Sequence, residues 1–448
     1  MTYISLSHDE ILFVSLCILL AKVFQQNLHK YFGFSQLHPV QERVLSLLTQ
    51  QNDVLAVLPT GFGKSLIYQL FALSQPGLTI VITPLLALMF DQVNKLQAKN
   101  ISAAAWNYLT PPNVKHLILR QVRQQNLKLL YISPEKLQSP LLTKVLQQTN
   151  ISCVVIDEAH CISEWGADFR PQYRSIGSWI HTYSIARPRP LCCAFTATAS
   201  QQMVGEISHY LQLHKPQVVA QACFRPNIRW QILTCPSENW KRYLCKHILT
   251  AWKLLTKENT GIILIYGATH LDVVWFTLWL RDHDFPQTEY FHAGLTEKDK
   301  IRILEMVMHT NSAIVVCTNA FGMGIDLPRV RLVIHLTPPV TLAAYVQEAG
   351  RAGRDGKLAY AVTLFQAQDW AKRVKYQVLY PDRENREKRI FEAQAVLKCL
   401  TRNECISRQI VRYFRLPETP VCSLRACQCM YCQPKFPWNC LNEKDKKS

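Results

Sequence analysis

Two adjacent carboxylates, Asp157 and Glu158, follow the apolar run at residues 153–156. Such a run predicts a buried parallel strand, whose carboxyl end faces the crevice where an open α/β sheet binds its ligands. At that place Asp157 could hold Mg²⁺, and Glu158 could orient or deprotonate an attacking water molecule. The pair therefore predicts a hydrolytic site.

An aromatic and basic segment follows in the same loop. Trp165, Phe169 and Arg170 lie within six consecutive residues. Rings beside a guanidinium suit the bases and phosphates of a nucleic acid, so this segment predicts a sensor for a bound strand. The alternative is that both rings are core aromatics.

A phosphate-binding loop is predicted about a hundred residues upstream. Residues 58–65 read Leu-Pro-Thr-Gly-Phe-Gly-Lys-Ser, between a strand-like run at 53–57 and a helical pattern from residue 66. Strand, loop and helix are the context that such a loop requires. Lys64 would reach the β- and γ-phosphates of ATP, and Ser65 would bind Mg²⁺. The backbone would cradle the phosphates at Thr60, Gly61, Phe62 and Gly63.

Composition limits the class of partner. The 448 residues include 50 Lys and Arg against 32 Asp and Glu, an excess of 50 − 32 = 18 positive charges. This balance favours a polyanion, although a basic surface that binds nothing is the alternative. Several of the 16 cysteines lie inside apolar strand-like runs and are best explained as buried thiols. We therefore expect an intracellular, reducing compartment, the cytoplasm of a bacterium or the nucleus of a eukaryote.

Residues 11–21 are strongly apolar but too short for a comfortable membrane span, and no basic region precedes them. We expect residues 1–27 to contain a helix packed on the first domain, and no membrane partner. A membrane anchor or a signal peptide is the alternative.

Strand-like and helical stretches alternate in two blocks. The pattern predicts an α/β fold with parallel sheets, a boundary near residues 224–227, and a smaller helical unit after about residue 370. The predicted strands lie near residues 53–57, 78–82, 128–132, 152–156, 191–195, 261–266, 288–292, 313–317, 331–336 and 359–364.

The second block has no phosphate-binding loop but holds two arginines at a short spacing. Residues 347–356 read Gln-Glu-Ala-Gly-Arg-Ala-Gly-Arg-Asp-Gly, which places Arg351 and Arg354 three residues apart. Either one could be an arginine finger that stabilises charge on the transferred phosphoryl group. The alternative is a pair of surface arginines.

These motifs, in this order, resemble the RecQ family of superfamily 2 DNA helicases from about residue 31 to 432. The resemblance implies two tandem RecA-like lobes, a small helical zinc-binding subdomain, and 3′→5′ unwinding of DNA in recombination and repair. It implies ATP, Mg²⁺ and Zn²⁺ as ligands and single-stranded or branched DNA as partner. Protein partners, such as single-strand-binding or recombination proteins, stay open. The implied segments are 1–27, 28–224 (first lobe), 225–368 (second lobe), 369–435 (zinc-binding subdomain) and 436–448 (tail).

The resemblance also assigns roles to single residues. Phe34 would pack on adenine beside His38, and Gln41 would read the edge of the base. Asp326 would contribute to the nucleotide site. Residues that would contact DNA, or couple it to hydrolysis, are His160, Trp165, Phe169, Arg170 and Gln347.

The cysteines near the end of the chain resemble the zinc ligands of the family. Cys405, Cys429 and Cys432 match three of them, and thiolates at such spacing favour tetrahedral Zn²⁺. The fourth ligand is Cys422 or Cys427. Cys422 is our choice because Cys427 leaves one residue before Cys429. Free or disulfide-bonded cysteines are the alternative.

The chain departs from the family pattern at several positions. His38 replaces an arginine, Glu164 and Ala167 replace a glutamine and a histidine, and residues 266–270 lack the usual Cys-x-Ser-Arg. No winged-helix or C-terminal helical domain is expected after the cysteines. Two other functions stay open: an RNA helicase, and a DNA-binding module with an inactive motor.

Overall fold

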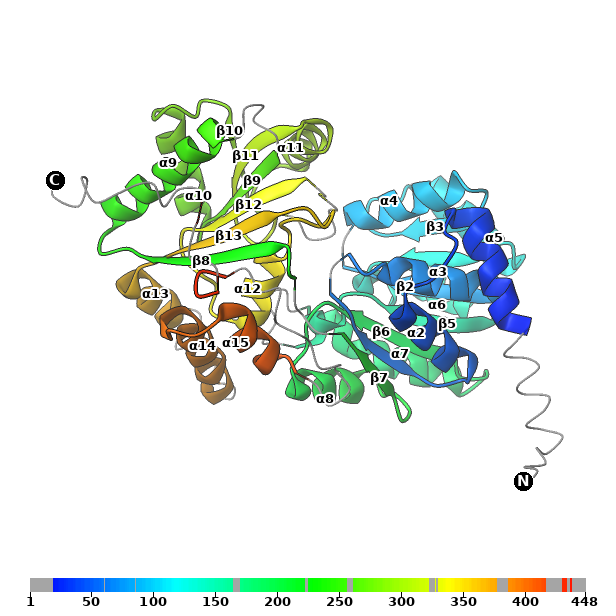
Figure 1. Ribbon diagram of the computed structural model, residues 1–448. Coiled ribbons are helices and arrows are strands. Elements are labelled where there is room, and N and C mark those ends of the chain that lie inside the picture. Colours follow the sequence, from blue (N-terminus) through cyan, green and yellow to red (C-terminus); the bar gives the residue numbers. More distant parts are fainter. Residues whose placement is uncertain are drawn as a thin grey trace, which may run out of the picture. The chain divides into compact units, whose positions relative to one another are not determined.

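The computed structural model of the chain describes residues 19–59, 61–84, 86–163, 170–221, 225–255, 261–321, 327, 329–376, 386–415, 429–432 and 436. The chain divides into two compact units, with the main division between Ala222 and Cys223. Each unit is an open sheet of parallel strands with helices on both faces (Figure 1). The predicted class of fold, two α/β lobes with parallel sheets, is confirmed.

The sheet of the first unit has the strand order β3-β4-β2-β5-β6-β1-β7, and all its pairs are parallel. Successive residues of a strand enter two different cores: Val54 packs on one face and Leu55 on the other. Burial on both faces explains why these strands are almost continuously apolar. The strands are β1 (Val54–Val57), β2 (Leu78–Ile82), β3 (Ala103–Trp106), β4 (Leu129–Ile132), β5 (Ile151–Ile156), β6 (Leu191–Thr196) and β7 (Gln217–Ala220).

Helices cover both faces of this sheet. One core contains side chains of α2 (Pro39–Thr49), α3 (Lys64–Ser74) and α4 (Leu86–Gln97). The opposite core contains side chains of α5 (Pro112–Arg123), α6 (Pro140–Leu146), α7 (Ser175–Ser184) and α8 (Gln201–Tyr210). Shorter turns are η1 (Leu28–Phe32), η2 (Pro134–Lys136), η3 (Ala159–Ile162) and η4 (Pro171–Arg174).

The apolar segment near the N-terminus is described from residue 19 onward. Residues 19–27 are helical, and Phe24 and Leu28 are buried in the same core as Val44 of α2. Residues 1–18, which include most of the apolar run, lie outside the described part of the chain. Among the described residues, no helix has both the length and the apolar character that a membrane crossing needs.

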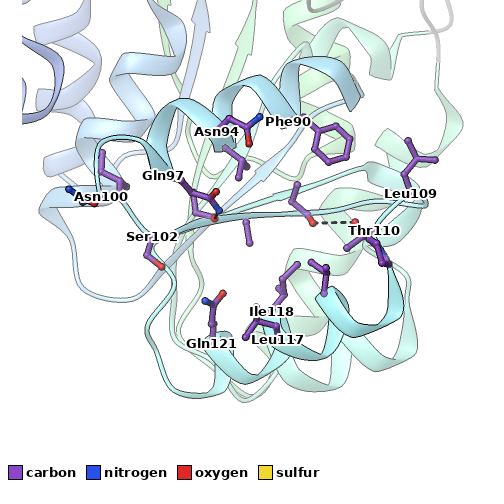
Figure 2. Close-up of a pocket in the computed structure, with 17 residues that line it drawn as sticks. Phe90, Asn94, Gln97, Asn100, Ser102, Leu109, Thr110, Leu117, Ile118 and Gln121 are labelled. Atoms are coloured by element: carbon purple, nitrogen blue, oxygen red, sulfur yellow. Dashed lines mark hydrogen bonds between the residues drawn. The ribbon is translucent and has the colours of Figure 1, made fainter. Parts of the chain in front are cut away.

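Strand β3 forms one edge of the first sheet, between α4 and α5, and its edge is closed by side chains (Figure 2). Gln97 Nε2 donates to the Ala103 carbonyl over 2.9 Å, and Thr110 Oγ1 donates to the Ala105 carbonyl over 3.2 Å. These bonds occupy carbonyls that another strand would need for pairing. A pocket of about 630 Å³ lies here, lined by residues of α4, β3 and α5.

The second unit repeats the design without its own phosphate-binding loop. Its strand order is β10-β11-β9-β12-β13-β8, and again all pairs are parallel. The strands are β8 (Ile228–Thr234), β9 (Gly261–Tyr266), β10 (Thr288–Phe291), β11 (Ser312–Cys317), β12 (Val330–His335) and β13 (Ala359–Phe365).

One face of this sheet packs on α9 (Glu238–Leu255) and α10 (His270–Arg281). The other face packs on α11 (Glu297–His309) and α12 (Leu342–Ala349). The same core includes side chains of α13 (Ala367–Val374), α14 (Arg386–Thr401), α15 (Ile406–Tyr413) and Cys429. The helical end of the chain is therefore joined to the second lobe through a shared core. The predicted segment bounds stay predictions.

Candidate nucleotide-hydrolysis site

The predicted phosphate-binding loop joins the end of β1 to the start of α3. Gly61 has φ 89° and Gly63 has φ 66°, so both adopt the left-handed region that favours glycine. Gly63 is the residue before the first turn of α3, where free backbone N–H groups and the helix dipole attract anions. Thr60 lies outside the described residues.

Lys64 is the first residue of α3, and its ammonium is placed for an anion. Nζ is buried and has no hydrogen-bond partner among the described residues. A buried ammonium without a partner costs free energy, which a bound phosphate would offset. This orphaned donor fits the β- and γ-phosphates that the sequence predicts for it.

Asp157 stands at the carboxyl end of β5 and is buried. Burial and the adjacent Glu158 raise the pKa of Asp157 to about 6, whereas Lys64 lowers it. Tyr173 fixes the backbone here, since its hydroxyl donates to the Asp157 carbonyl over 3.0 Å. Asp157 and Ser65 offer the oxygen ligands that Mg²⁺ prefers.

Glu158 has a strained backbone with φ 48°, a conformation that residues other than glycine rarely adopt. Its Oε2 lies 3.3 Å from His160 Nδ1, which also lies 3.3 Å from Thr196 Oγ1 at the end of β6. The Thr196 hydroxyl donates to the Thr198 carbonyl over 3.0 Å. The structure thus connects Glu158, the predicted general base, to His160, a predicted coupling residue, and through it to Thr196.

The two ends of the predicted DNA-sensing loop are anchored in the first unit. Ser163 Oγ donates to Glu206 of α8 over 2.8 Å, and Arg170 pairs with Glu135 at 3.3 Å. Residues 164–169, which include Trp165 and Phe169, lie outside the described part of the chain. The described anchors tie the two ends of the loop to η2 and to α8.

The predicted adenine residues lie around the start of α2. Gln41 Nε2 donates to the Phe62 carbonyl over 2.9 Å, and Gln41 Oε1 accepts from the His38 backbone N–H over 2.9 Å. The His38 and Phe62 rings meet edge to face at 5.2 Å. Phe34 is 55% exposed, as an aromatic surface for a base must be. The bond from Gln41 to the phosphate-binding loop was not foreseen from the sequence.

In the second unit, the predicted arginines follow the end of α12. Arg351 is buried, with 6% of its surface exposed, whereas Arg354 is half-buried. Burial raises the pKa of Tyr266, and the Arg351 guanidinium beside it acts in the opposite direction. Gln347 is half-buried on α12, and Asp326 lies outside the described residues.

Three of the predicted zinc ligands come together. The sulfurs of Cys405, Cys429 and Cys432 all lie within 4.8 Å of one another. Cys429 Sγ is 3.6 Å from Cys405 Sγ and 3.7 Å from Cys432 Sγ. Four sulfurs at about 2.3 Å from a tetrahedral Zn²⁺ are about 3.8 Å apart, so the spacing fits zinc. Cys422 and Cys427 both lie outside the described residues.

Models of known families match both units. The family described as DEAD/DEAH box helicase matches residues 38–207, and the helicase conserved C-terminal domain matches residues 241–356. A solved structure of the helicase MrfA bound to DNA has a TM-score of 0.64 and 17% identity, over 79% of this chain and 50% of that one. Mss116p bound to single-stranded RNA and AMP-PNP also has a TM-score of 0.64, at 18% identity over 88% and 87%. At these identities the likeness shows the fold alone.

The two parallel-sheet units and the phosphate-binding loop define the class, a two-lobed helicase motor. Similarity to curated relatives narrows this class to one family. The ATP-dependent DNA helicase RecQ of Synechocystis is 35% identical over 394 residues, which cover 86% of this chain and 78% of the relative. The helicase SGS1 of Saccharomyces cerevisiae is 33% identical over 86% of this chain, but the match covers 27% of that protein. The chain belongs to the RecQ family of ATP-dependent DNA helicases.

The share of each relative that is matched differs widely. The chain spans 66% of the probable helicase RecS of Bacillus subtilis and 59% of the RecQ helicase of Pasteurella multocida. The chain thus matches only part of the length of these relatives.

Proposed function

We propose that this chain hydrolyses ATP and uses the energy to move along single-stranded DNA and to unwind duplex DNA. The family implies the 3′→5′ direction of movement. The observation that carries the proposal is the orphaned, buried ammonium of Lys64 beside the buried Asp157 and the half-buried Glu158. A cation and two carboxylates at the carboxyl end of a parallel sheet are the groups that phosphoryl transfer to water requires.

Each group would have a separate task in the hydrolysis. The backbone at Gly61 and Gly63 would bind the phosphates, and Lys64 would neutralise charge on the β- and γ-phosphates. Mg²⁺, held by Ser65 and Asp157, would supply further charge neutralisation. Glu158 would orient the attacking water and accept its proton, and Asp157 is its immediate neighbour in the chain.

Arg351 and Arg354 would act as the arginine contribution of the second unit. A guanidinium stabilises the charge that spreads over the transferred phosphoryl group. Their place on one short loop after α12 supports a common task.

We propose DNA as the partner because of the net positive charge of the chain and its membership of the RecQ family. The excess of 18 positive charges favours a polyanion. Trp165, Phe169 and Arg170 would sense the strand, and His160 would pass the signal on through its contacts with Glu158 and Thr196. The substrates proposed are single-stranded and branched DNA.

Zinc would have a structural task. Cys405, Cys429, Cys432 and Cys422 would hold one Zn²⁺, which would fasten the segment after α15 to the core of the second unit. The buried thiols of the two sheets support an intracellular, reducing environment.

The ATPase rate with and without single-stranded DNA, and with RNA of the same length, tests this proposal. We expect stimulation by DNA that exceeds the stimulation by RNA. The variants Lys64→Ala and Glu158→Gln should each lose at least about 100-fold in kcat, because they remove phosphate and water contacts. Glu158→Gln should still bind ATP. Equal stimulation by RNA would favour the RNA-helicase alternative, and the absence of hydrolysis in the unmodified protein would favour an inactive motor.

A further inference from the structure

The loop that carries Arg351 and Arg354 depends on one glycine. Gly353 has φ +59°, which other residues adopt only with strain. A Cβ atom there would lie 2.5 Å from Asn227 Nδ2 and 2.7 Å from the Lys357 carbonyl oxygen. The backbone of this loop is thus packed directly against residue 227, at the beginning of the second unit.

Arg225 holds the same loop through its carbonyl groups. Its Nη1 donates to Gly350 O over 3.2 Å, and its Nη2 donates to Ala352 O over 3.2 Å and to Gly353 O over 2.7 Å. The three acceptors flank Arg351 on both sides. A guanidinium can make such a set of bonds because its donors are fixed in one plane, whereas an ammonium acts as a point charge.

Asn227 fixes the other half of the loop. Its side-chain N–H groups donate to Gly353 O over 2.7 Å and to Lys357 O over 2.9 Å, so its amide acts as a double donor. Its own backbone carbonyl accepts from the Ala359 N–H over 2.9 Å, at the first residue of β13. The carbonyls of residues 353 and 357 flank Arg354 as those of residues 350 and 352 flank Arg351.

Charge alone does not explain why Arg225 is in this place. Burial lowers the pKa of Arg225, and the neighbouring Arg354 lowers it further, although Asp355 acts in the opposite direction. Asp355 is itself paired with Arg331 of β12. A half-buried cation next to another cation is unfavourable, so the gain must come from the geometry that its hydrogen bonds impose.

We propose that Arg225 and Asn227 are positioning residues for ATP hydrolysis: they hold the backbone of residues 350–357 so that Arg351 and Arg354 keep a fixed arrangement. This inference rests on the proposed ATPase function of the two arginines. Arg225 also lies within three residues of the main division between the two units, which falls after residue 222. The clamp of Arg225 and Asn227 therefore fastens the arginine loop to the point where the chain enters the second unit.

The test compares Arg225→Gln and Asn227→Asp in the full chain. The first removes the forked donor, and the second replaces two donors by a carboxylate of the same shape that would repel both carbonyls. We expect kcat of the DNA-stimulated ATPase to fall by about 10- to 100-fold, because misplacing a catalytic group by about 1 Å has effects of this size. KM for ATP and the affinity for single-stranded DNA should change by less than about threefold.

Arg373→Gln is the matched control. Arg373 is, like Arg225, a half-buried arginine of the second unit, and it donates to the Thr337 carbonyl over 2.8 Å and to the Pro338 carbonyl over 3.1 Å, on a loop without the two arginines. A purely structural effect would lower kcat in this variant as well, at an equal loss of thermal stability. Arg225→Lys should restore only part of kcat, since it keeps the charge without the fork.

The outcomes separate the clamp from the proposed function beneath it. The inference is supported if Arg225→Gln and Asn227→Asp lose kcat while Arg373→Gln, melting at a similar temperature, keeps it. It is overturned if the clamp variants keep kcat while Arg351→Ala and Arg354→Ala lose it. If the two arginine variants also keep kcat, the role of the arginines in hydrolysis fails, and the clamp has no catalytic task.

Discussion

Lys64 and Asp157 carry opposite charges in a place where burial makes a charge unfavourable. The ammonium of Lys64 has no hydrogen-bond partner among the described residues, and burial together with Glu158 raises the pKa of Asp157 to about 6. Both observations support the proposed site for a nucleotide and its metal ion. We expect the charge of Asp157 to destabilise the metal-free protein, and the sign of that effect can be measured.

Replacing Asp157 by Asn should stabilise the metal-free protein at pH 7.5 while it abolishes hydrolysis. The pKa of Asp157 is raised in the folded state, so its ionised form costs stability above about pH 6 and costs nothing below about pH 4, where it is protonated in both states. The rise of the Asp157 pKa from its ordinary value of 3.8 to about 6 corresponds to a loss of at most about 3 kcal/mol in the free energy of unfolding. Thermal melting in EDTA at pH 7.5 and pH 4.5 checks this, with a gain expected only at the higher pH.

Asp53→Asn is the control for this measurement, because the same exchange should have the opposite sign. Asp53 is also buried in the first unit, but it pairs with Arg189 at 2.7 Å and accepts from the backbone N–H groups of Cys192 and His214. Losing these bonds should lower the melting temperature at pH 7.5. A lower melting temperature for Asp157→Asn as well would contradict the account of the site.

At the scale of elements, the sequence predicts the strands that are buried on both faces and misses several others. All ten predicted strands form, from β1 to β13, because apolar runs of this kind have few alternatives. β3 was missed since Ala103, Ala104 and Ala105 have low strand propensity, and it forms at a sheet edge because β4 is there to pair with it. β7 and β8 were missed as well, and each stands at an edge of its sheet.

For the site, too, the sequence predicts residues that lie close together in the chain and misses contacts between distant ones. Lys64, Asp157, Glu158 and the arginines could be predicted because each belongs to a motif that is short in sequence. The clamp could not, since Arg225 contacts the loop from 125 to 128 residues away, and its local sequence predicts only a domain boundary. Contacts at such separation are set by the strand order β12-β13-β8, which local patterns do not encode.

The cysteine cluster gives a prediction at the level of the helical end. The protein should bind about one zinc per chain, and removal of the metal should lower the stability of the second unit. Metal analysis of the purified protein, before and after treatment with a strong chelator, measures the zinc content. Thermal melting of the same samples measures the loss of stability. Cys429→Ala and Cys422→Ala should each lose zinc, whereas Cys427→Ala should keep it.

Cys245→Ala is the matched control, because Cys245 is a buried thiol on α9, in the core on the other side of the second sheet. It should retain the metal. Retention of zinc by Cys429→Ala, or no zinc in protein grown with added zinc, would contradict the proposed site. Loss in Cys427→Ala with retention in Cys422→Ala would reverse the choice of the fourth ligand.

For the whole molecule, the fold alone does not decide between DNA and RNA as the substrate. The fold is equally close to a helicase solved with DNA and to one solved with RNA, with a TM-score of 0.64 for each. The choice of DNA therefore rests on the RecQ relatives. The excess of positive charge should add affinity for either polyanion, and affinity of that kind should weaken steeply with salt.

The most direct test of the central claim is an unwinding assay on two short DNA duplexes, one with a 3′ and one with a 5′ single-stranded tail. The account predicts that this chain separates the 3′-tailed duplex in an ATP-dependent manner, and that Glu158→Gln does not. Failure to separate either duplex by a protein that still hydrolyses ATP would contradict the claim that hydrolysis is coupled to unwinding. Separation of the 5′-tailed duplex alone would contradict the proposed direction.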